Sequence, residues 1–321
     1  MALRTRARFA EVARDGGHYE SFYIKACHPS EPRGVWIRHT VWKAPGKEAV
    51  GSLWCTLFDA GWARPVAWKE TRPPAELGVG EGEYLHVGDA RLTDRVAWSP
   101  RWELSFDGDA EPFAYLPRPW MYRARLPRTK AESLYPKVRF GGWVELGGRR
   151  VELDGWPGMI GHNWGSEYAE RWIWLHGATF EEAPGAVFDA IMGRVRVGRW
   201  TLPWIANGFV ELEGRRHRLG GLERLRSTKV QEAPDRCAFV LGGADGLVVE
   251  GEIIAPRERL VGWVYSDPCG GRHDVLHSSI AEARLVVRRP DRSLTALGGA
   301  TYEIGMRESG HGVPIEPFPD P

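Results

Sequence analysis

Two side chains in apolar surroundings are the strongest candidates for chemistry in this sequence. His162 lies in the stretch Gly-His-Asn-Trp-Gly (161–165), and an imidazole can act as an acid or a base near neutral pH. Asp189 lies between Val187 and Ile191, and the alternation of a strand would place all three on one apolar face. A carboxyl on such a face is costly unless it is hydrogen-bonded or protonated, and buried carboxyls with raised pKa are common acids. We therefore predict that His162 and Asp189 are catalytic.

Both residues also have a plainer interpretation. His162 could bond to backbone carbonyls and only fix a tight turn. Asp189 could bond to a neighbouring backbone N–H or an Arg and only hold the sheet together. The sequence leaves these alternatives open.

Tryptophan is unusually frequent, with 16 Trp in 321 residues. An indole buries a large apolar area, but its N–H needs a partner, so a wide apolar cavity with a few polar anchors suits Trp well. Trp172 and Trp174 would point to the same side of one strand. The predicted substrate-binding residues are Asn163, Trp164, Trp172, Trp174 and Phe188.

Motifs for metals and cofactors are missing from the sequence. His273, Asp274 and His277 lie close together, but no third ligand follows at a convincing metal-site spacing. The chain has no G-x-S-x-G elbow, no P-loop and no dinucleotide fingerprint between a strand and a helix. We therefore expect neither a metal nor a cofactor.

The elements that would position these residues are strands. Hydrophobic residues alternate with polar ones in most segments, and Gly, Pro and Asp separate the segments. The arms 137–146 and 149–154 around Gly147-Gly148 read as a hairpin. Helices are expected only at 6–14 and 128–134. Because no helices separate the strands, a parallel α/β fold is excluded, and an all-β protein with antiparallel barrels or sandwiches is predicted.

The length allows two β domains. We place the first at 1–150, the second at 151–310 and a Pro-rich tail at 311–321, with the seam between 125 and 165. The tail is expected to fray because it is rich in Pro.

The charge and cysteine content favour an ordinary intracellular protein. The net charge is +1 and the Arg residues are scattered along the chain, so we expect no attraction to nucleic acid or acidic lipid. The four Cys are not spaced as pairs, which favours reduced thiols, and no secretory signal or membrane span is recognised. We expect a cytoplasmic protein without integral membrane association.

Two segments carry a resemblance to a known superfamily. Residues 152–177 contain His162, Trp164 and Gly165, followed by the Trp172-x-Trp174 strand, and residues 20–46 have a strand, an aromatic-rich strand and a polar turn. This pattern resembles the superfamily of carotenoid 1,2-hydratase, AttH-type proteins, tocopherol cyclase and the lipocalin-like pericyclases (Diels–Alderases). The resemblance implies two lipocalin-like β domains, with an apolar ligand site in one of them or at their junction.

The same resemblance raises a doubt about hydration. In the hydratase branch a Tyr two positions before an Asp assists the His; here Asp189 matches, but the Tyr position holds Val187. A second Tyr-x-Asp occurs at 265–267, where it reads as a strand end.

The predicted function is a cofactor-independent enzyme for an apolar terpenoid, polyene or polyketide-like molecule. Cyclisation, isomerisation or hydration would begin when His162 or Asp189 protonates a double bond, and Trp faces would stabilise the resulting cation. A pericyclic reaction would need only the shape of the cavity. The alternative is a non-catalytic carrier for the same kind of apolar ligand.

Overall fold

The computed structural model describes residues 3–319, and strands dominate it. Within those residues there is no α-helix, only short 3₁₀ turns at Phe9–Glu11, Pro74–Glu76, Pro119–Tyr122, Leu222–Arg224, Ala244–Gly246 and Arg257–Arg259. The described part of the chain also holds no helix long and apolar enough to cross a bilayer. The all-β class predicted from the sequence is confirmed.

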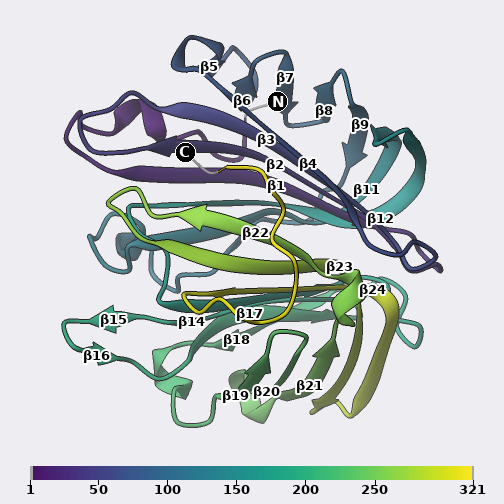
Figure 1. The fold of residues 1–321 in the computed structure, drawn as a ribbon. Coiled ribbons are helices and arrows are strands. Elements are labelled where there is room, and N and C mark those ends of the chain that lie inside the picture. Colours follow the sequence, from purple (N-terminus) through teal and green to yellow (C-terminus); the bar gives the residue numbers. More distant parts are fainter. Residues whose placement is uncertain (1–2, 320–321) are drawn as a thin grey trace.

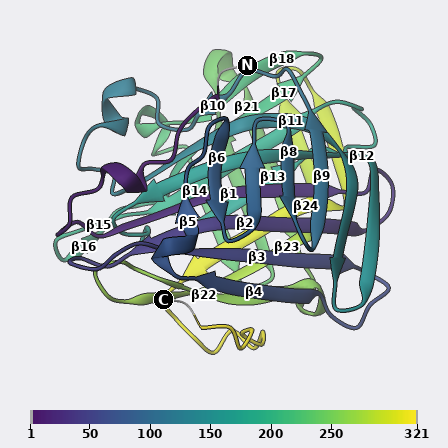
Figure 2. The ribbon, with the colours of Figure 1, turned by 90° about the horizontal axis from the view of Figure 1, so that it is seen from above.

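The first sheet has twelve antiparallel strands in the order β4-β3-β2-β1-β12-β11-β9-β8-β7-β6-β5, with β10 paired to β11 (Figures 1 and 2). Its strands are β1 (His18–Cys27), β2 (Arg33–Lys43), β3 (Val50–Asp59), β4 (Val66–Arg72), β5 (Leu77–Gly78), β6 (Glu83–Val87), β7 (Ala90–Thr93), β8 (Val96–Ser99), β9 (Trp102–Asp107), β10 (Phe113–Ala114), β11 (Thr129–Leu146) and β12 (Arg149–Gly165).

The second sheet has ten strands in the order β18-β17-β14-β13-β24-β23-β21-β20-β19, with β22 paired to β23. A small hairpin, β15–β16, projects from one side of the molecule (Figure 1). These strands are β13 (Arg171–Gly177), β14 (Val187–Arg194), β15 (Arg196–Val197), β16 (Trp200–Thr201), β17 (Ile205–Leu212), β18 (Arg215–Gly220), β19 (Lys229–Ala233), β20 (Arg236–Gly242), β21 (Val248–Ile254), β22 (Val261–Ser266), β23 (Arg272–Arg288) and β24 (Arg292–Met306).

Both sheets are built on the same strand order. In each, the first strand pairs with the second strand on one side and with the last long strand on the other: β1 lies between β2 and β12, and β13 lies between β14 and β24. A long terminal hairpin, β11–β12 or β23–β24, completes each half. The two halves are therefore equivalent in topology, although no repeat is visible in the sequence.

Local sequence explains the predicted hairpin, whereas the two predicted helices are absent from the structure. Gly147 and Gly148 both have positive φ, as a two-residue turn requires, and the predicted hairpin is the tip of the longer β11–β12 hairpin. Residues 128–134 are not helical, because Thr129 onward pairs with β12. The predicted N-terminal helix shrinks to the 3₁₀ turn Phe9–Glu11.

The division between the two sheets falls after Gly165 and before Arg171. The predicted boundary at 150/151 lies at the start of β12, and β12 pairs with β1 in the first sheet. Within the described residues the Pro-rich tail contacts the rest of the molecule. Phe318 packs near Trp263, and Lys69 donates a hydrogen bond to the carbonyl of Pro319. Residues 320–321 lie outside the described part.

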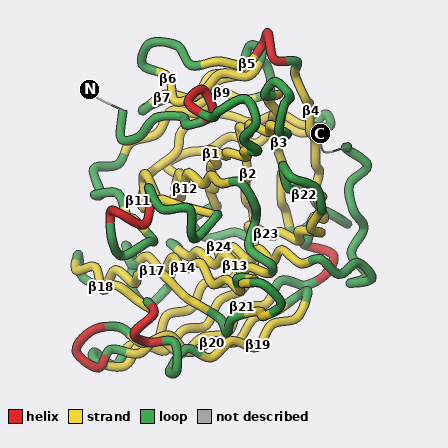
Figure 3. The backbone as a smooth tube through the Cα atoms, turned by 90° about the vertical axis from the view of Figure 1, so that its left-hand side faces the viewer, coloured by secondary structure: helices red, strands yellow, loops and turns green. Residues whose placement is uncertain are grey.

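The two sheets lie face to face, as the tube view from the side shows (Figure 3). An aromatic cluster fills part of the space between them, with Trp36 and Trp54 of the first sheet packed near Trp263 of the second. Each sheet also curves around its own apolar core on the far side. Many of the 16 Trp therefore serve packing, and only a few are left for a cavity.

Candidate functional site

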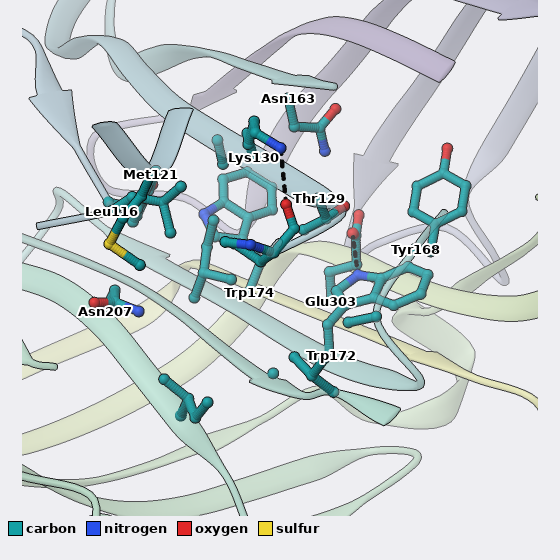
Figure 4. A pocket seen from close by; sticks show the side chains of 18 of the residues that line it. Leu116, Met121, Thr129, Lys130, Asn163, Tyr168, Trp172, Trp174, Asn207 and Glu303 are labelled. Carbon is teal, nitrogen blue, oxygen red and sulfur yellow. Dashed lines mark hydrogen bonds between the residues drawn. The ribbon is translucent and has the colours of Figure 1, made fainter. Parts of the chain in front are cut away.

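A cavity of about 380 Å³ lies between the two sheets, beside the aromatic cluster. The segment 115–127, which follows β10, forms one wall, and strands from both sheets form the others. Figure 4 shows part of this lining, including Trp172, Trp174 and Glu303. Its aromatic members are Tyr19, Tyr23, Trp36, Tyr115, Tyr168, Trp172, Trp174 and Tyr265. Three of the 16 Trp therefore line the cavity, together with five Tyr.

The Trp172-x-Trp174 pair of β13 points into this cavity, as the alternation of a strand predicted. The strand beside Trp172 carries a glycine at the facing position, Gly305 of β24. A Cβ on Gly305 would overlap the indole of Trp172, so the ring lies flat over the neighbouring backbone. Glycine is required there by close approach rather than by an unusual φ.

The motif 161–165 ends β12, and alternation divides it between two faces of the first sheet. Asn163 lines the cavity, and Gly161 lies beneath the ring of Tyr23, which also lines it. His162 and Trp164 face the other side, where His162 stacks on Phe22. The motif is therefore a strand segment and not a tight turn.

His162 is fully buried and does not line the cavity. Its Nε2 donates a hydrogen bond to Oε1 of Glu20, at 2.7 Å. Glu20 also accepts from His18 and from the backbone N–H groups of Arg8 and Phe9. Burial alone would raise the pKa of Glu20, but the hydrogen bonds from His162 and His18 lower it to about 2. The cluster holds the N-terminal segment against the sheet.

Asp189 is fully buried directly behind the cavity wall. Its Oδ2 accepts from the hydroxyl of Tyr115 at 2.7 Å, and its Oδ1 accepts from the indole N–H of Trp174 at 3.1 Å. Burial raises its pKa to about 6, although these bonds act in the opposite direction. Asp189 thus reaches the cavity through Tyr115 and Trp174, both of which line it. It can hold a proton in mildly acidic conditions.

Glu303 of β24 is the second buried carboxyl of the site, and it lines the cavity itself. Oε1 accepts from the indole N–H of Trp172 at 3.1 Å (Figure 4), and Oε2 accepts from Nδ1 of His277 at 3.1 Å. Burial disfavours the charged form and is the largest single effect, but the hydrogen bonds from His277 and Trp172 and the positive charge of Arg38 together outweigh it, so the pKa of Glu303 is lowered. Glu303 is therefore ionised at neutral pH.

Arg38 of β2 places a buried guanidinium at the same cavity. Its Nε donates to Ser21, and its plane lies over the ring of Tyr265 at 4.3 Å. Within residues 3–319, its Nη1 has no hydrogen-bond partner, and the same holds for the hydroxyl of Tyr19 and the indole nitrogen of Trp36. All three residues line the cavity. Three cavity-lining residues thus carry a buried donor without a hydrogen-bond partner in the described residues.

The structure therefore separates the predicted site residues into two groups. Asn163, Trp172 and Trp174 line the cavity, whereas Trp164 stacks on His162 and Phe188 stacks on Phe239 in the core of the second half. His162 and Asp189 do not open onto one space, because His162 points to the far face of the first sheet.

Sequence reasoning missed Tyr115, Glu303 and Arg38. The argument used for Asp189 would not have found Glu303, since its same-face neighbours in β24 are Thr301 and Gly305 rather than apolar side chains. Tyr115 lies in an irregular segment, where no pattern marks it. Across the described residues, no group of three or more metal-ligating side chains comes together.

Comparison with known proteins places this geometry in context. A family model for tocopherol cyclase-like proteins matches residues 137–215. The uncharacterized protein Rv0493c of Mycobacterium tuberculosis is 26% identical over 299 residues, which cover 91% of this chain and 87% of that protein. CghA with Sch210972 superposes with a TM-score of 0.57 at 9% identity, covering 91% of this chain and 89% of that one. The fold is that of the lipocalin-like superfamily.

A second solved structure supports the same fold. An AttH-type protein of Nitrosomonas europaea matches with a TM-score of 0.51 at 11% identity, covering 94% of this chain and 97% of that chain. At such identities the likeness concerns the lipocalin-like fold alone. The chemistry has to be argued from the residues of this cavity.

Proposed function

We propose that the protein is an enzyme that isomerises, cyclises or hydrates an apolar molecule with carbon–carbon double bonds inside this cavity. One observation carries the proposal. Asp189 and Glu303 flank strand β13, each bound to one of its indoles, and their pKa values are shifted in opposite directions. Two carboxyls whose surroundings separate their pKa values are the arrangement from which acid and base roles are assigned.

Asp189 is the proposed proton source, acting through Tyr115. The Tyr115 hydroxyl gives its proton to an alkene carbon, and the protonated Asp189 gives its own proton to the Tyr115 oxygen. A C–H bond forms, the π bond breaks and a carbocation remains, while Asp189 becomes a carboxylate. The faces of Trp172 and Trp174 then stabilise the cation.

Glu303 is the proposed acceptor for the second proton transfer. Its carboxylate takes a proton from a carbon beside the cation, and a new double bond forms there. The number of hydrogens in the substrate is unchanged, as isomerisation or cyclisation requires. In a hydration, water would add to the cation instead and lose its proton to Glu303. His162 has no part in either route, because its ring lies on the other face of the sheet.

The substrate proposed here also carries an oxygen function. The donors of Arg38, Tyr19 and Trp36 that lack partners in the described chain line the cavity, and burial without a partner is costly. A carboxylate or enolate oxygen would pair with the Arg38 guanidinium at the cavity, while the hydrocarbon part contacts the aromatic residues of the wall. No cofactor is part of this proposal.

The test is incubation of the protein with an apolar extract of its source cells in D₂O, followed by mass spectrometry of the products. Proton-initiated isomerisation or cyclisation should place deuterium on carbon without changing the elemental composition otherwise, and hydration should add water as well. Asp189→Asn should lower the formation of either product by about 10²-fold or more.

Other results of this incubation would contradict the proposal. A product without deuterium would indicate a reaction driven by shape alone. A ligand that binds and leaves unchanged would indicate the carrier.

A further inference from the structure

The mouth of the cavity is apolar and exposed. Leu126, Leu202 and Leu222 line the cavity, yet each is also among the exposed large hydrophobic residues. They come from three separate segments: 117–128, 194–202 and 222–229. We call these three segments the rim. An apolar entrance with exposed leucines suits a ligand that does not arrive through water.

The rim also carries two tryptophans with the largest exposed fractions among the exposed hydrophobic residues. Trp120 is 64% exposed and Trp200 is 66% exposed. Trp120 precedes the cavity-lining Met121, and Trp200 lies in β16 of the projecting β15–β16 hairpin (Figure 1). Neither position contributes to a core in the described chain. Exposed Trp at the edge of an apolar patch is typical of proteins that rest in a membrane interface.

Charge distinguishes the rim from the rest of the molecule. The three segments contain ten basic residues and a single acidic one, Glu223, whereas the whole chain has a net charge of +1. The basic residues are Arg118, Arg123, Arg125, Arg128, Arg194, Arg196, Arg199, Arg224, Arg226 and Lys229. The net charge of the whole chain does not reveal this cluster, because the three segments are distant in sequence.

Part of this charge is compensated and part is not. Arg128 pairs with Glu167, and Arg224 pairs with Glu223. Arg118, Arg123, Arg125 and Arg199 form no salt bridge with any carboxylate in residues 3–319. Arg199 instead lies over the ring of Trp200, at 4.9 Å. The rim therefore presents uncompensated positive charge next to its exposed indoles.

We propose that the rim docks on an anionic membrane surface, and that the apolar ligand passes between the bilayer and the cavity without crossing water. The arginines contact acidic headgroups, and Trp120, Trp200 and the rim leucines enter the region between headgroups and acyl chains. The association is peripheral, because only the tips of three loops and turns are apolar.

Sedimentation with lipid vesicles tests this docking on the full chain. Vesicles of phosphatidylcholine are compared with vesicles that also contain phosphatidylglycerol. The protein should bind the anionic vesicles about tenfold more tightly, and high salt should release it. Equal binding to both kinds of vesicle, or binding to neither, would overturn the proposal.

Variants locate the contact on the surface. Trp120→Ala with Trp200→Ala, and separately Arg118→Glu with Arg199→Glu, should each reduce vesicle binding about tenfold. All four side chains are exposed, so the fold should persist. Trp98→Ala is the matched control, since Trp98 is 40% exposed on β8 and lies outside the rim. If the rim variants bind like the control, the docking surface is wrong.

This outcome is separate from the proposed function. Deuterium incorporation with a substrate supplied in detergent reports on the cavity, and vesicle binding reports on the rim.

Discussion

The indole N–H of Trp172 lies 3.1 Å from Oε1 of Glu303, and this bond ties β13 to a charged group on β24. Trp174, two residues along β13, makes the equivalent bond to Asp189 on β14, on the opposite side. A single strand therefore holds both carboxyls of the site in place with its two indoles. The two indoles of the Trp-x-Trp pattern therefore position Glu303 and Asp189 and also form part of the apolar wall of the cavity.

The position of Trp172 depends on one of its two glycine neighbours. Gly305→Ala should force the indole away from β24, because the added Cβ would overlap the ring. We expect loss of the bond to Glu303 and a destabilisation of about 1–3 kcal/mol, as for other overpacked sites, measured by thermal unfolding and Trp fluorescence. Gly193→Ala is the control. Gly193 faces Trp172 from β14, and its Cβ would meet nothing closer than 3.8 Å. Equal effects of both variants would disprove this account.

Asp189 should make the stability of the protein depend on pH. Burial raises its pKa from 3.8 to about 6, so the folded state binds the proton more tightly than the unfolded chain. This contribution is fully present below pH 3.8 and is lost as the pH rises through about 6. Relative to Asp189→Asn, which cannot titrate, the wild type should lose stability on the order of 3 kcal/mol over that range. Chemical unfolding at a series of pH values measures the difference, and a constant difference would contradict the raised pKa.

The two residues predicted as catalytic should behave differently in turnover. Asp189→Asn and Tyr115→Phe should each lower the rate by about 10²-fold or more with the fold intact, because each interrupts the proton route. His162→Gln should change the rate less than about twofold, because the His162 side chain lies on the face of the first sheet that does not border the cavity. Product formation in D₂O with circular dichroism as the folding control distinguishes them. A large loss of rate in a fully folded His162→Gln would restore His162 to the mechanism.

Glu20 should control the N-terminal segment. Glu20→Gln keeps the shape but weakens the acceptor for the N–H groups of Arg8 and Phe9, so that segment should open more often. Limited trypsin digestion should then cut after Arg6 or Arg8 several times faster than in the wild type. Glu11→Gln is a control on the same segment, because Glu11 pairs only with the exposed Arg6. Unchanged cleavage in Glu20→Gln would show that Glu20 does not hold the N-terminal segment in place.

Arg38 should select the head group of the ligand. All-trans-retinoate and retinol differ only at their polar end, and the wild type should bind retinoate about tenfold more tightly. Arg38→Met should remove this preference while retinol binding persists, whereas Lys130→Met, at another cationic position of the cavity, should keep it. Quenching of Trp fluorescence measures both affinities. If the wild type bound retinoate and retinol equally, the proposal that the substrate carries an oxygen function would be wrong.

The sequence predicted the fold better than it predicted the site, for a physical reason. Alternation reports which face of a strand is apolar, so the strands, the hairpin at Gly147-Gly148 and the shared face of Trp172 and Trp174 could all be read directly. Alternation does not report which of two faces borders a cavity. His162 and Asn163 were therefore assigned together, although they lie on opposite sides of β12.

The remaining site residues depend on contacts between distant segments. Tyr115 reaches Asp189 across 74 positions of sequence, and Trp172 reaches Glu303 across 131. The Trp172–Glu303 pair is fixed by the pairing of β13 with β24 inside the second sheet, and the Tyr115–Asp189 pair by the packing of the segment after β10 against β14. A local sequence pattern contains neither. A carboxyl on an apolar strand face was the signal that did exist, and it identified Asp189; Glu303 lies between Thr301 and Gly305 on its face and gives no such signal.

The alternating faces of β12 have a consequence for how this protein can change in evolution. Positions 161 and 163 shape the cavity, while 162 and 164 belong to the cluster around Glu20 that holds the N-terminal segment against the sheet. Substitutions at 161 and 163 would therefore affect ligand binding, whereas substitutions at 162 and 164 would affect the stability of the fold. Asn163 can be exchanged to accept a new molecule while His162 and Trp164 preserve the scaffold, whereas Gly161 is fixed by the ring of Tyr23 above it.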